Sequence, residues 1–150
     1  MINPRTRKSA AIKPRKPRTT SIRQRRLIPA APEEVYDAFV NAQKHTEFTG
    51  AKATCDAKVG GRFTAWDGYI TGRNLELKPG KSIVQEWTTT EWPDGSPPSR
   101  VEFTFARKGA ATEVAMVHSN VPASQAGSYR EGWTAYYWKP LKEYFQKKKS

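Results

Sequence analysis

Apolar and polar residues alternate through the middle of the chain, which is the pattern of β-strands that bury one face. The clearest run places Val101, Phe103 and Phe105 on one side, with polar residues between them. Turns rich in glycine and proline separate the runs, and Asp67-Gly68 is a strong hairpin signal. The pattern predicts antiparallel strands over residues 21–28, 52–57, 62–65, 69–77, 82–90, 100–105 and 111–119.

Two segments after the first of these strands have helical character instead. Pro32 suits the first position of a helix, and Glu33 and Glu34 suit its positive end. A second short helix is expected over residues 42–48, and Gly50 is expected to end it.

The longest helix is expected after Val121-Pro122, with Ser124 as its N-cap. Apolar residues then keep a 3.6-residue period over five turns, at Tyr129, Trp133, Tyr136, Tyr137, Leu141, Tyr144 and Phe145. Pro140 lies inside this helix and is expected to kink it, because proline has no N–H to donate.

The order of these elements predicts an α+β domain of the helix-grip kind. A curved antiparallel sheet of about six to seven strands would wrap around the long C-terminal helix, with the two short helices after the first strand. Any space left between the sheet and the helix would be an apolar cavity. We expect this domain to span residues 21–146, between a disordered basic arm at 1–20 and a basic tail at 147–150.

Composition changes the picture mainly through the distribution of charge. The 150 residues include 26 Lys plus Arg and 14 Asp plus Glu, for a formal net charge of +12. Residues 1–26 hold ten basic side chains and no acidic one, and three lysines lie at 147–149, so the body between them is close to neutral. The basic residues of the expected arm are Arg5, Arg7, Lys8, Lys13, Arg15, Lys16 and Arg18.

Such an arm favours weak, nonspecific contact with nucleic acid or with another anionic surface. The alternative is a solubilising extension, or a start codon placed upstream. The single cysteine excludes an intrachain disulfide, and no run of 18 apolar residues or secretory signal is present. We therefore expect no transmembrane segment and a cytoplasmic location.

An ordered set of motifs resembles the C-terminal domain of the activator of heat-shock protein 90 ATPase, within the START/birch-pollen-allergen-like (SRPBCC) superfamily of helix-grip folds. The motifs are Phe48-Thr49-Gly50-Ala51, Val59-Gly60-Gly61-Arg62-Phe63, residues 67–72, residues 77–87, Trp92-Pro93-Asp94-Gly95, Val121-Pro122 and residues 132–138. The resemblance runs from about residue 22 to residue 145 and implies the helix-grip fold.

The resemblance also implies a function, which is contact with a heat-shock protein 90-type chaperone in a stress response. The eukaryotic activator has a separate N-terminal domain that makes a major chaperone contact. Here a short basic arm stands in that place, so we expect less than full stimulation of the ATPase. The alternative is binding of a small hydrophobic or aromatic, lipid-like ligand in the cavity between sheet and helix.

Catalytic residues are not expected, because a nucleophile needs a nearby base and the sequence contains only two histidines. His45 lies in a polar run without a converging set of metal ligands. His118 is in phase with the apolar residues of the last strand, so it either faces a ligand and titrates near neutral pH or is a satisfied, partly buried histidine. Cys55 is interpreted as a small core residue. No enzyme, metal or cofactor is therefore predicted.

Large aromatic residues are the dominant candidate feature. Two interpretations remain open: the rings line a small pocket, or they fill the core completely. The candidate cavity residues are Trp66, Trp87, Phe103, Phe105, Met116, His118, Trp133, Tyr136 and Tyr137.

Overall fold

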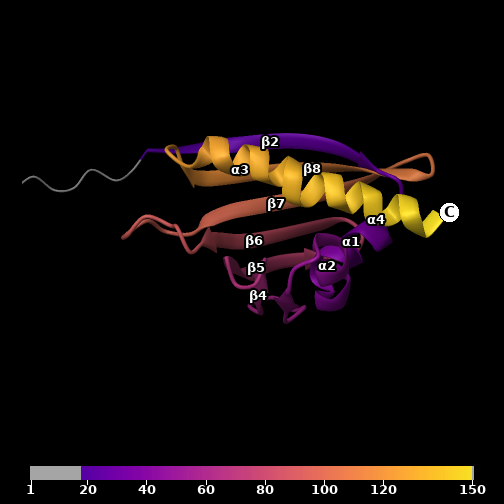
Figure 1. Cartoon of the computed structure of the whole chain (residues 1–150), viewed down its shortest axis with the longest axis horizontal. Helices are drawn as coiled ribbons and strands as arrows, with labels where there is room; N and C mark the ends of the chain where they lie inside the picture. Colours follow the sequence, from indigo (N-terminus) through magenta and orange to yellow (C-terminus); the bar gives the residue numbers. More distant parts are fainter. Residues whose placement is uncertain (1–17, 150) are drawn as a thin grey trace, which may run out of the picture.

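The computed structural model of the chain describes residues 18–149 (Figure 1). Its elements are β2 (Thr19–Ile28), α1 (Pro32–Val40), α2 (Ala42–Thr49), β3 (Thr54–Cys55), β4 (Arg62–Ala65), β5 (Ile70–Lys78), β6 (Ser82–Thr89), β7 (Ser99–Lys108), β8 (Ala111–Pro122), α3 (Ala126–Trp133), the π-helical turn η1 (Thr134–Trp138) and α4 (Lys139–Lys149). The arm residues Arg5, Arg7, Lys8, Lys13, Arg15 and Lys16 lie outside the described residues.

The seven strands form one antiparallel sheet in the order β2-β8-β7-β6-β5-β4-β3. The strands from β3 to β8 follow one another as neighbours, and β2 pairs with β8, so the first and last strands meet at one edge. The helical segment from α3 to α4 runs along the sheet, with α1 and α2 near its C-terminal part (Figure 1). This architecture confirms the expected α+β helix-grip fold.

Local sequence signals set the ends of the two short helices. Pro32 occupies the first position of α1, and the Ala31 N–H donates to the Glu34 carboxylate at 3.0 Å. Asn41 caps α2 through its side chain, which accepts from the Lys44 N–H at 2.9 Å. Gly50 ends α2 with a φ of 81°, a left-handed conformation that glycine adopts at little cost.

The long helix begins later than the sequence suggested. The expected N-cap, Ser124, precedes the helix without capping it, and the N-cap position belongs to Gln125, which makes no capping hydrogen bond through its side chain. The Gln125 amide nitrogen instead donates to the carbonyl of Glu91 at 2.7 Å. The Gln125 side chain therefore ties the start of α3 to the turn that follows β6.

A π turn interrupts the same helix immediately before Pro140. The Lys139 N–H reaches back five residues to the Thr134 carbonyl, which widens the turn. This extra residue shifts the phase of the buried stripe. Tyr136, expected on that stripe, is 57% exposed, whereas Trp138, which was not expected there, is 1% exposed.

Several boundaries differ from the expected ones; β7 and β8, for example, each run three residues further. Strand β2 already begins at Thr19, and the Arg18 carbonyl accepts from the Ala123 N–H at 2.8 Å. Strand β3 contains only Thr54 and Cys55, although the alternation suggested a strand over residues 52–57. Helix α4 continues to Lys149, through the residues expected to form a tail.

The core lies between the sheet and the long helix. Its largest fully buried side chains include Trp138, Phe103, Met116 and His118. Phe39 of α1 stacks on Phe103 of β7 with ring centroids 4.5 Å apart, so the short helices close the same core. Within residues 18–149, no helix has both the length and the apolarity needed to cross a membrane.

Candidate functional site

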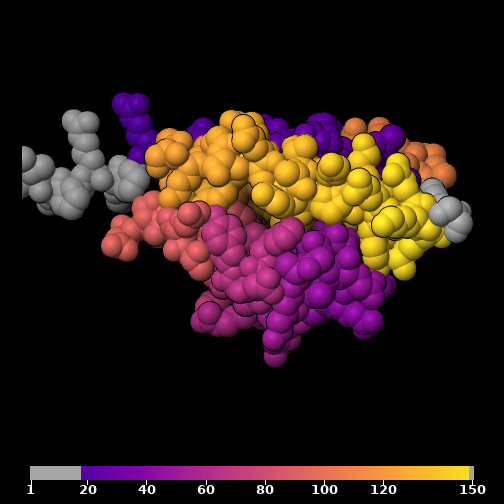
Figure 2. All heavy atoms as spheres, viewed as in Figure 1, coloured from indigo at the N-terminus to yellow at the C-terminus, as the bar shows by residue number. Residues whose placement is uncertain are grey.

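A groove of about 450 Å³ opens between the long helix and the turn that joins β4 to β5. The helix (orange) and the strands around residues 60–75 (magenta) lie side by side on the face seen in Figure 2. The residues that line it are Trp66, Tyr69, Ile70, Trp87, Tyr129, Gly132, Trp133, Tyr136 and Tyr137. We call this feature the aromatic groove.

A tight turn places the Trp66 ring at one wall of the aromatic groove. Trp66 and Asp67 have φ values of 54° and 57°, and Gly68 follows with 87°. Positive φ is costly for a residue with a side chain, so such a turn needs support from its surroundings. Here two hydrogen bonds to the backbone of Lys52 support it. The Asp67 N–H donates to the Lys52 carbonyl at 3.0 Å, and the Lys52 N–H donates to the Asp67 carboxylate at 3.1 Å.

The opposite wall comes from the π turn. Tyr136 points outward from the widened turn and meets the Trp66 ring edge to face, with centroids 5.3 Å apart. Gly132, one turn earlier, adds no side chain to the groove. The indole N–H of Trp66 is buried without a hydrogen-bond partner, which is unusual for a polar group.

Polar side chains at the β6 end of the groove form a closed ring of hydrogen bonds. The Glu91 N–H donates to Thr89, whose hydroxyl donates to the Tyr129 oxygen at 2.7 Å. The Tyr129 hydroxyl donates to the Gln125 carbonyl oxygen at 2.7 Å, and the Gln125 amide returns to the Glu91 backbone. The Tyr69 hydroxyl donates to the Glu91 carboxylate at 2.6 Å. Burial, reinforced by Glu91, raises the pKa of Tyr69.

Behind the groove, His118 is fixed as a neutral side chain. The Trp133 indole N–H donates to His118 Nδ1 at 3.1 Å, so Nε2 carries the proton and donates to the Ser99 hydroxyl at 2.8 Å. Ser99 in turn donates to the Trp87 carbonyl at 2.6 Å. Burial lowers the pKa of His118 to about 3. This histidine therefore serves packing between β7, β8 and the helix, and it neither lines the groove nor titrates near neutral pH.

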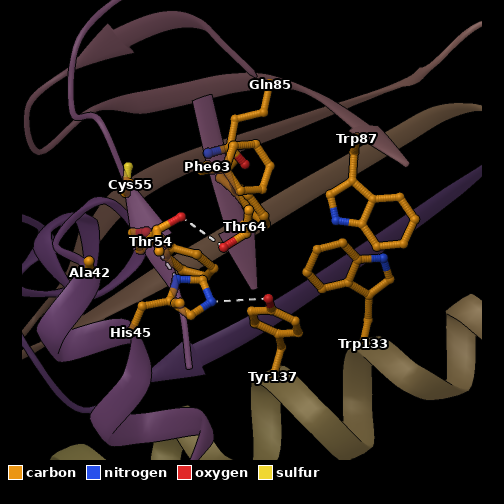
Figure 3. A pocket seen from close by; sticks show the side chains of 13 residues that line it. Ala42, His45, Thr54, Cys55, Phe63, Thr64, Gln85, Trp87, Trp133 and Tyr137 are labelled. Carbon is orange, nitrogen blue, oxygen red and sulfur yellow. Dashed lines mark hydrogen bonds between the residues drawn. The ribbon is translucent and has the colours of Figure 1, made fainter. Parts of the chain in front are cut away.

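The second histidine is also buried and neutral, although it lies in a polar run of the sequence. Tyr137 points at His45 and donates to its Nε2 at 3.0 Å, while Nδ1 donates to the Phe39 carbonyl at 3.0 Å (Figure 3). Burial lowers the pKa of His45 and raises that of Tyr137. The free space around this pair is only about 10 Å³, so the core is filled here.

Cys55 stands beside this filled region as a half-buried thiol. The Asn74 amide approaches its sulfur at 3.8 Å, and burial raises the thiol pKa. A raised pKa disfavours the reactive thiolate. Among residues 18–149, no three His, Cys, Asp or Glu side chains gather as metal ligands.

The structure brings together five of the nine candidate cavity residues. Trp66, Trp87, Trp133, Tyr136 and Tyr137 line the aromatic groove. The other four pack in the core away from it: Phe103, Phe105, Met116 and His118.

Four residues of the groove were missed. Tyr129 carried a signal, because it began the aromatic period of the helix. Tyr69 and Ile70 follow the Asp67-Gly68 turn signal, but nothing local showed that this turn faces the helix. Gly132 contributes by lacking a side chain, and the sequence gave no sign of that.

Comparison with known proteins identifies the family to which this domain is similar. Residues 29–146 match the family model "Activator of Hsp90 ATPase homolog 1-like protein". The human "Activator of 90 kDa heat shock protein ATPase homolog 1" is 34% identical over 127 residues, which cover 85% of this chain and 37% of that protein. A Dictyostelium discoideum "Activator of 90 kDa heat shock protein ATPase homolog" is 34% identical over 120 residues, covering 79% of this chain and 31% of that protein.

A solved structure agrees with these relatives. The crystal structure of an HSP90 activator from Plasmodium falciparum superposes with a TM-score of 0.78 at 26% identity, covering 84% of this chain and 96% of that one. The chain spans about a third of the length of the curated relatives it matches. Because the family model and the relatives agree over most of its residues, the chain belongs to the Activator of Hsp90 ATPase homolog 1-like family.

Proposed function

We propose that this chain is a non-enzymatic regulator that binds a 90 kDa heat-shock-protein chaperone and changes the rate of its ATPase. The observation that carries the proposal is the 34% identity over 127 residues to the human activator homologue. The shared region is the helix-grip domain, which accounts for 37% of that relative. We therefore expect this domain itself to make the chaperone contact.

The interior supports a role in protein contact rather than catalysis. Both histidines are buried and neutral at physiological pH, and the thiol pKa of Cys55 is raised. A general base or nucleophile needs access to substrate and a pKa suited to its task, which these three groups do not have.

ATP turnover by a purified 90 kDa heat-shock-protein ATPase tests the proposal. The expected result is a saturable change in phosphate release as this chain is added, with an inhibitor of the chaperone used to subtract unrelated ATPase. Calorimetry in parallel separates binding from stimulation. The proposal would be overturned if chaperones from more than one source showed no binding and no change in ATPase rate.

A second candidate function is binding of a small apolar ligand in the aromatic groove. The specific observation in its favour is the groove volume of about 450 Å³, which lies within the range of about 300–1,000 Å³ typical of small-molecule sites. Saturable binding of a neutral fluorescent naphthylamine tests it, and no binding to the folded protein would remove this candidate.

A further inference from the structure

Strand β2 forms one edge of the sheet, because β8 is the only described strand that pairs with it. No labelled element lies beyond it in Figure 1. At such an edge, the backbone groups of alternate residues point away from the sheet and lack strand partners. The Arg25 carbonyl is one of these groups, since it accepts from the Arg26 guanidinium at 2.8 Å. The free edge therefore offers hydrogen bonds to another extended chain.

The residues at this outward spacing carry basic side chains. Arg23 and Arg25 are exposed, whereas Ile22 of the same strand is buried, so the two arginines lie on the face of the sheet away from the long helix. A hollow of about 380 Å³ lies beside them, with Ala115 and Val117 of β8 in its lining. Positive charge and open space therefore flank the free edge.

Little negative charge within the chain offsets these arginines. Arg25 pairs with Glu113 at 3.3 Å, but its side chain is 72% exposed, and such surface pairs contribute little. Within residues 18–149, neither Arg23 nor Arg26 forms an ion pair. Pairing of two β2 edges would bring arginine against arginine, which disfavours a second copy of this chain as the partner. The edge instead suits a strand with acidic side chains.

From these observations we propose that the β2 edge binds an extended, acidic segment of another protein, which adds a strand to the sheet. Residues that face each other across antiparallel strands have their side chains on the same side. Acidic residues at positions i and i+2 of the segment would therefore face Arg25 and Arg23. An apolar residue at i−2 would face Leu27, which is 53% exposed. A nucleic acid fits less well, because its phosphate backbone has no N–H donors for the outward carbonyls.

Fluorescence anisotropy with short labelled peptides tests the proposal on the full chain. The probe is Val-Thr-Glu-Thr-Glu-Thr-Ser, and its control is Val-Thr-Glu-Glu-Thr-Thr-Ser, which has the same composition and charge but places the glutamates on opposite faces of a strand. We expect the probe to bind at least fivefold more tightly than the control. A probe that is N-methylated at both glutamates is expected to bind at least fivefold more weakly, because it cannot donate to the edge.

Arg23→Glu is the protein variant, and Arg62→Glu is its matched control. Arg62 is also exposed, but it lies on β4 within the sheet, opposite Arg73, so the same reversal of charge there gains a partner. We expect Arg23→Glu to weaken binding of the probe at least fivefold and Arg62→Glu to leave it unchanged. Thermal unfolding checks that both variants are folded, and the N-methylated probe decides the question on the natural sequence if one is not.

Equal binding of the probe and its out-of-phase control would show nonspecific attraction to basic residues and would overturn the proposal. Absence of binding, or binding that N-methylation does not weaken, would do the same. A DNA duplex provides the remaining comparison. If the duplex displaces the probe at a lower concentration than the unlabelled peptide does, and Arg23→Glu weakens the duplex as well, the edge is a nucleic-acid site and the proposal is wrong.

Discussion

At the scale of single residues, two of the three tryptophans that line the aromatic groove differ in their hydrogen bonds. Trp133 donates to His118, whereas the Trp66 N–H is buried without a partner. An unpaired buried donor is destabilising, and removing one partner of a buried pair leaves the other unsatisfied. The same substitution is therefore expected to have different effects at the two positions.

Trp133→Phe leaves His118 Nδ1 without a donor and is expected to lower the free energy of unfolding by about 2 kcal/mol or more. Trp66→Phe removes the unpaired N–H together with some ring contact, so its cost is expected to stay below about 1 kcal/mol. Urea unfolding of the two variants measures both values. Equal losses would show that the hydrogen bond of Trp133 does not matter.

His118 also predicts how stability depends on pH. An unfolded histidine takes up a proton near its ordinary pKa of 6.5, whereas the buried side chain resists protonation until about pH 3. The contribution of His118 to the free energy of unfolding is therefore complete above pH 6.5. Between pH 6.5 and about pH 3 it is lost as pH falls, by about 1.4 kcal/mol per pH unit. His45, whose pKa is also lowered by burial, adds in the same direction.

His118→Gln keeps a neutral side chain at this position and cannot take up the proton. We expect this variant to be less stable at pH 7 but to lose less stability between pH 6 and pH 4.5 than the natural sequence. Urea unfolding over this range measures the two slopes, and carboxylates contribute equally to both. Parallel slopes would contradict the assignment of this pH dependence to His118.

At the scale of elements, the glycines Gly72 of β5 and Gly132 of α3 differ in the space around them. A Cβ on Gly72 would lie 2.0 Å from the Glu86 carbonyl oxygen and 2.6 Å from the Phe63 ring. The absent side chain thus allows β4, β5 and β6 to pack with Phe63 lying over the middle strand. Gly132 in α3 has no such crowding.

Gly72→Ala is therefore expected to lose more than about 2 kcal/mol of stability or to fail to fold, because backbone must move to admit the methyl group. Gly132→Ala is expected to gain about 0.5–1 kcal/mol, since glycine weakens a helix interior by that amount relative to alanine. Thermal unfolding of the two variants and the natural sequence gives the comparison. A stable Gly72→Ala protein would show that the strands can separate locally.

Elements with local signals could be predicted from the sequence, and those that depend on distant contacts could not. Proline at residue 32 and glycine at residue 50 mark helix ends through their own backbone properties. The π turn could not be predicted, because a 3.6-residue period assumes a regular helix. The turn changes which ring is buried, so that Trp138 lies in the core and Tyr136 is exposed. His45 lies in a polar run of the sequence, but it is buried in the core, where it bonds Tyr137, 92 residues further along the chain.

At the scale of the whole molecule, charge and fold are separable. Residues 1–17 carry six of the basic side chains of the expected arm and no acidic one, whereas strand β2 begins at Thr19. The Arg18 carbonyl already pairs with the end of β8. A chain that begins at Arg18 therefore keeps the paired sheet edge while its formal net charge falls from +12 by six units.

Removal of residues 1–17 is expected to leave the free energy of unfolding unchanged within about 0.5 kcal/mol. If the arm binds nucleic acid, as its charge predicts, the full chain binds a DNA duplex with an affinity that falls steeply with salt. Each lost phosphate contact reduces the slope of log K against log salt by about 0.9, so the shortened chain shows weaker binding and a flatter dependence. Fluorescence anisotropy at several salt concentrations measures both slopes. Strand β2 itself carries Arg23, Arg25 and Arg26. An unchanged slope would therefore show that DNA contacts the edge of the sheet at β2 rather than the arm.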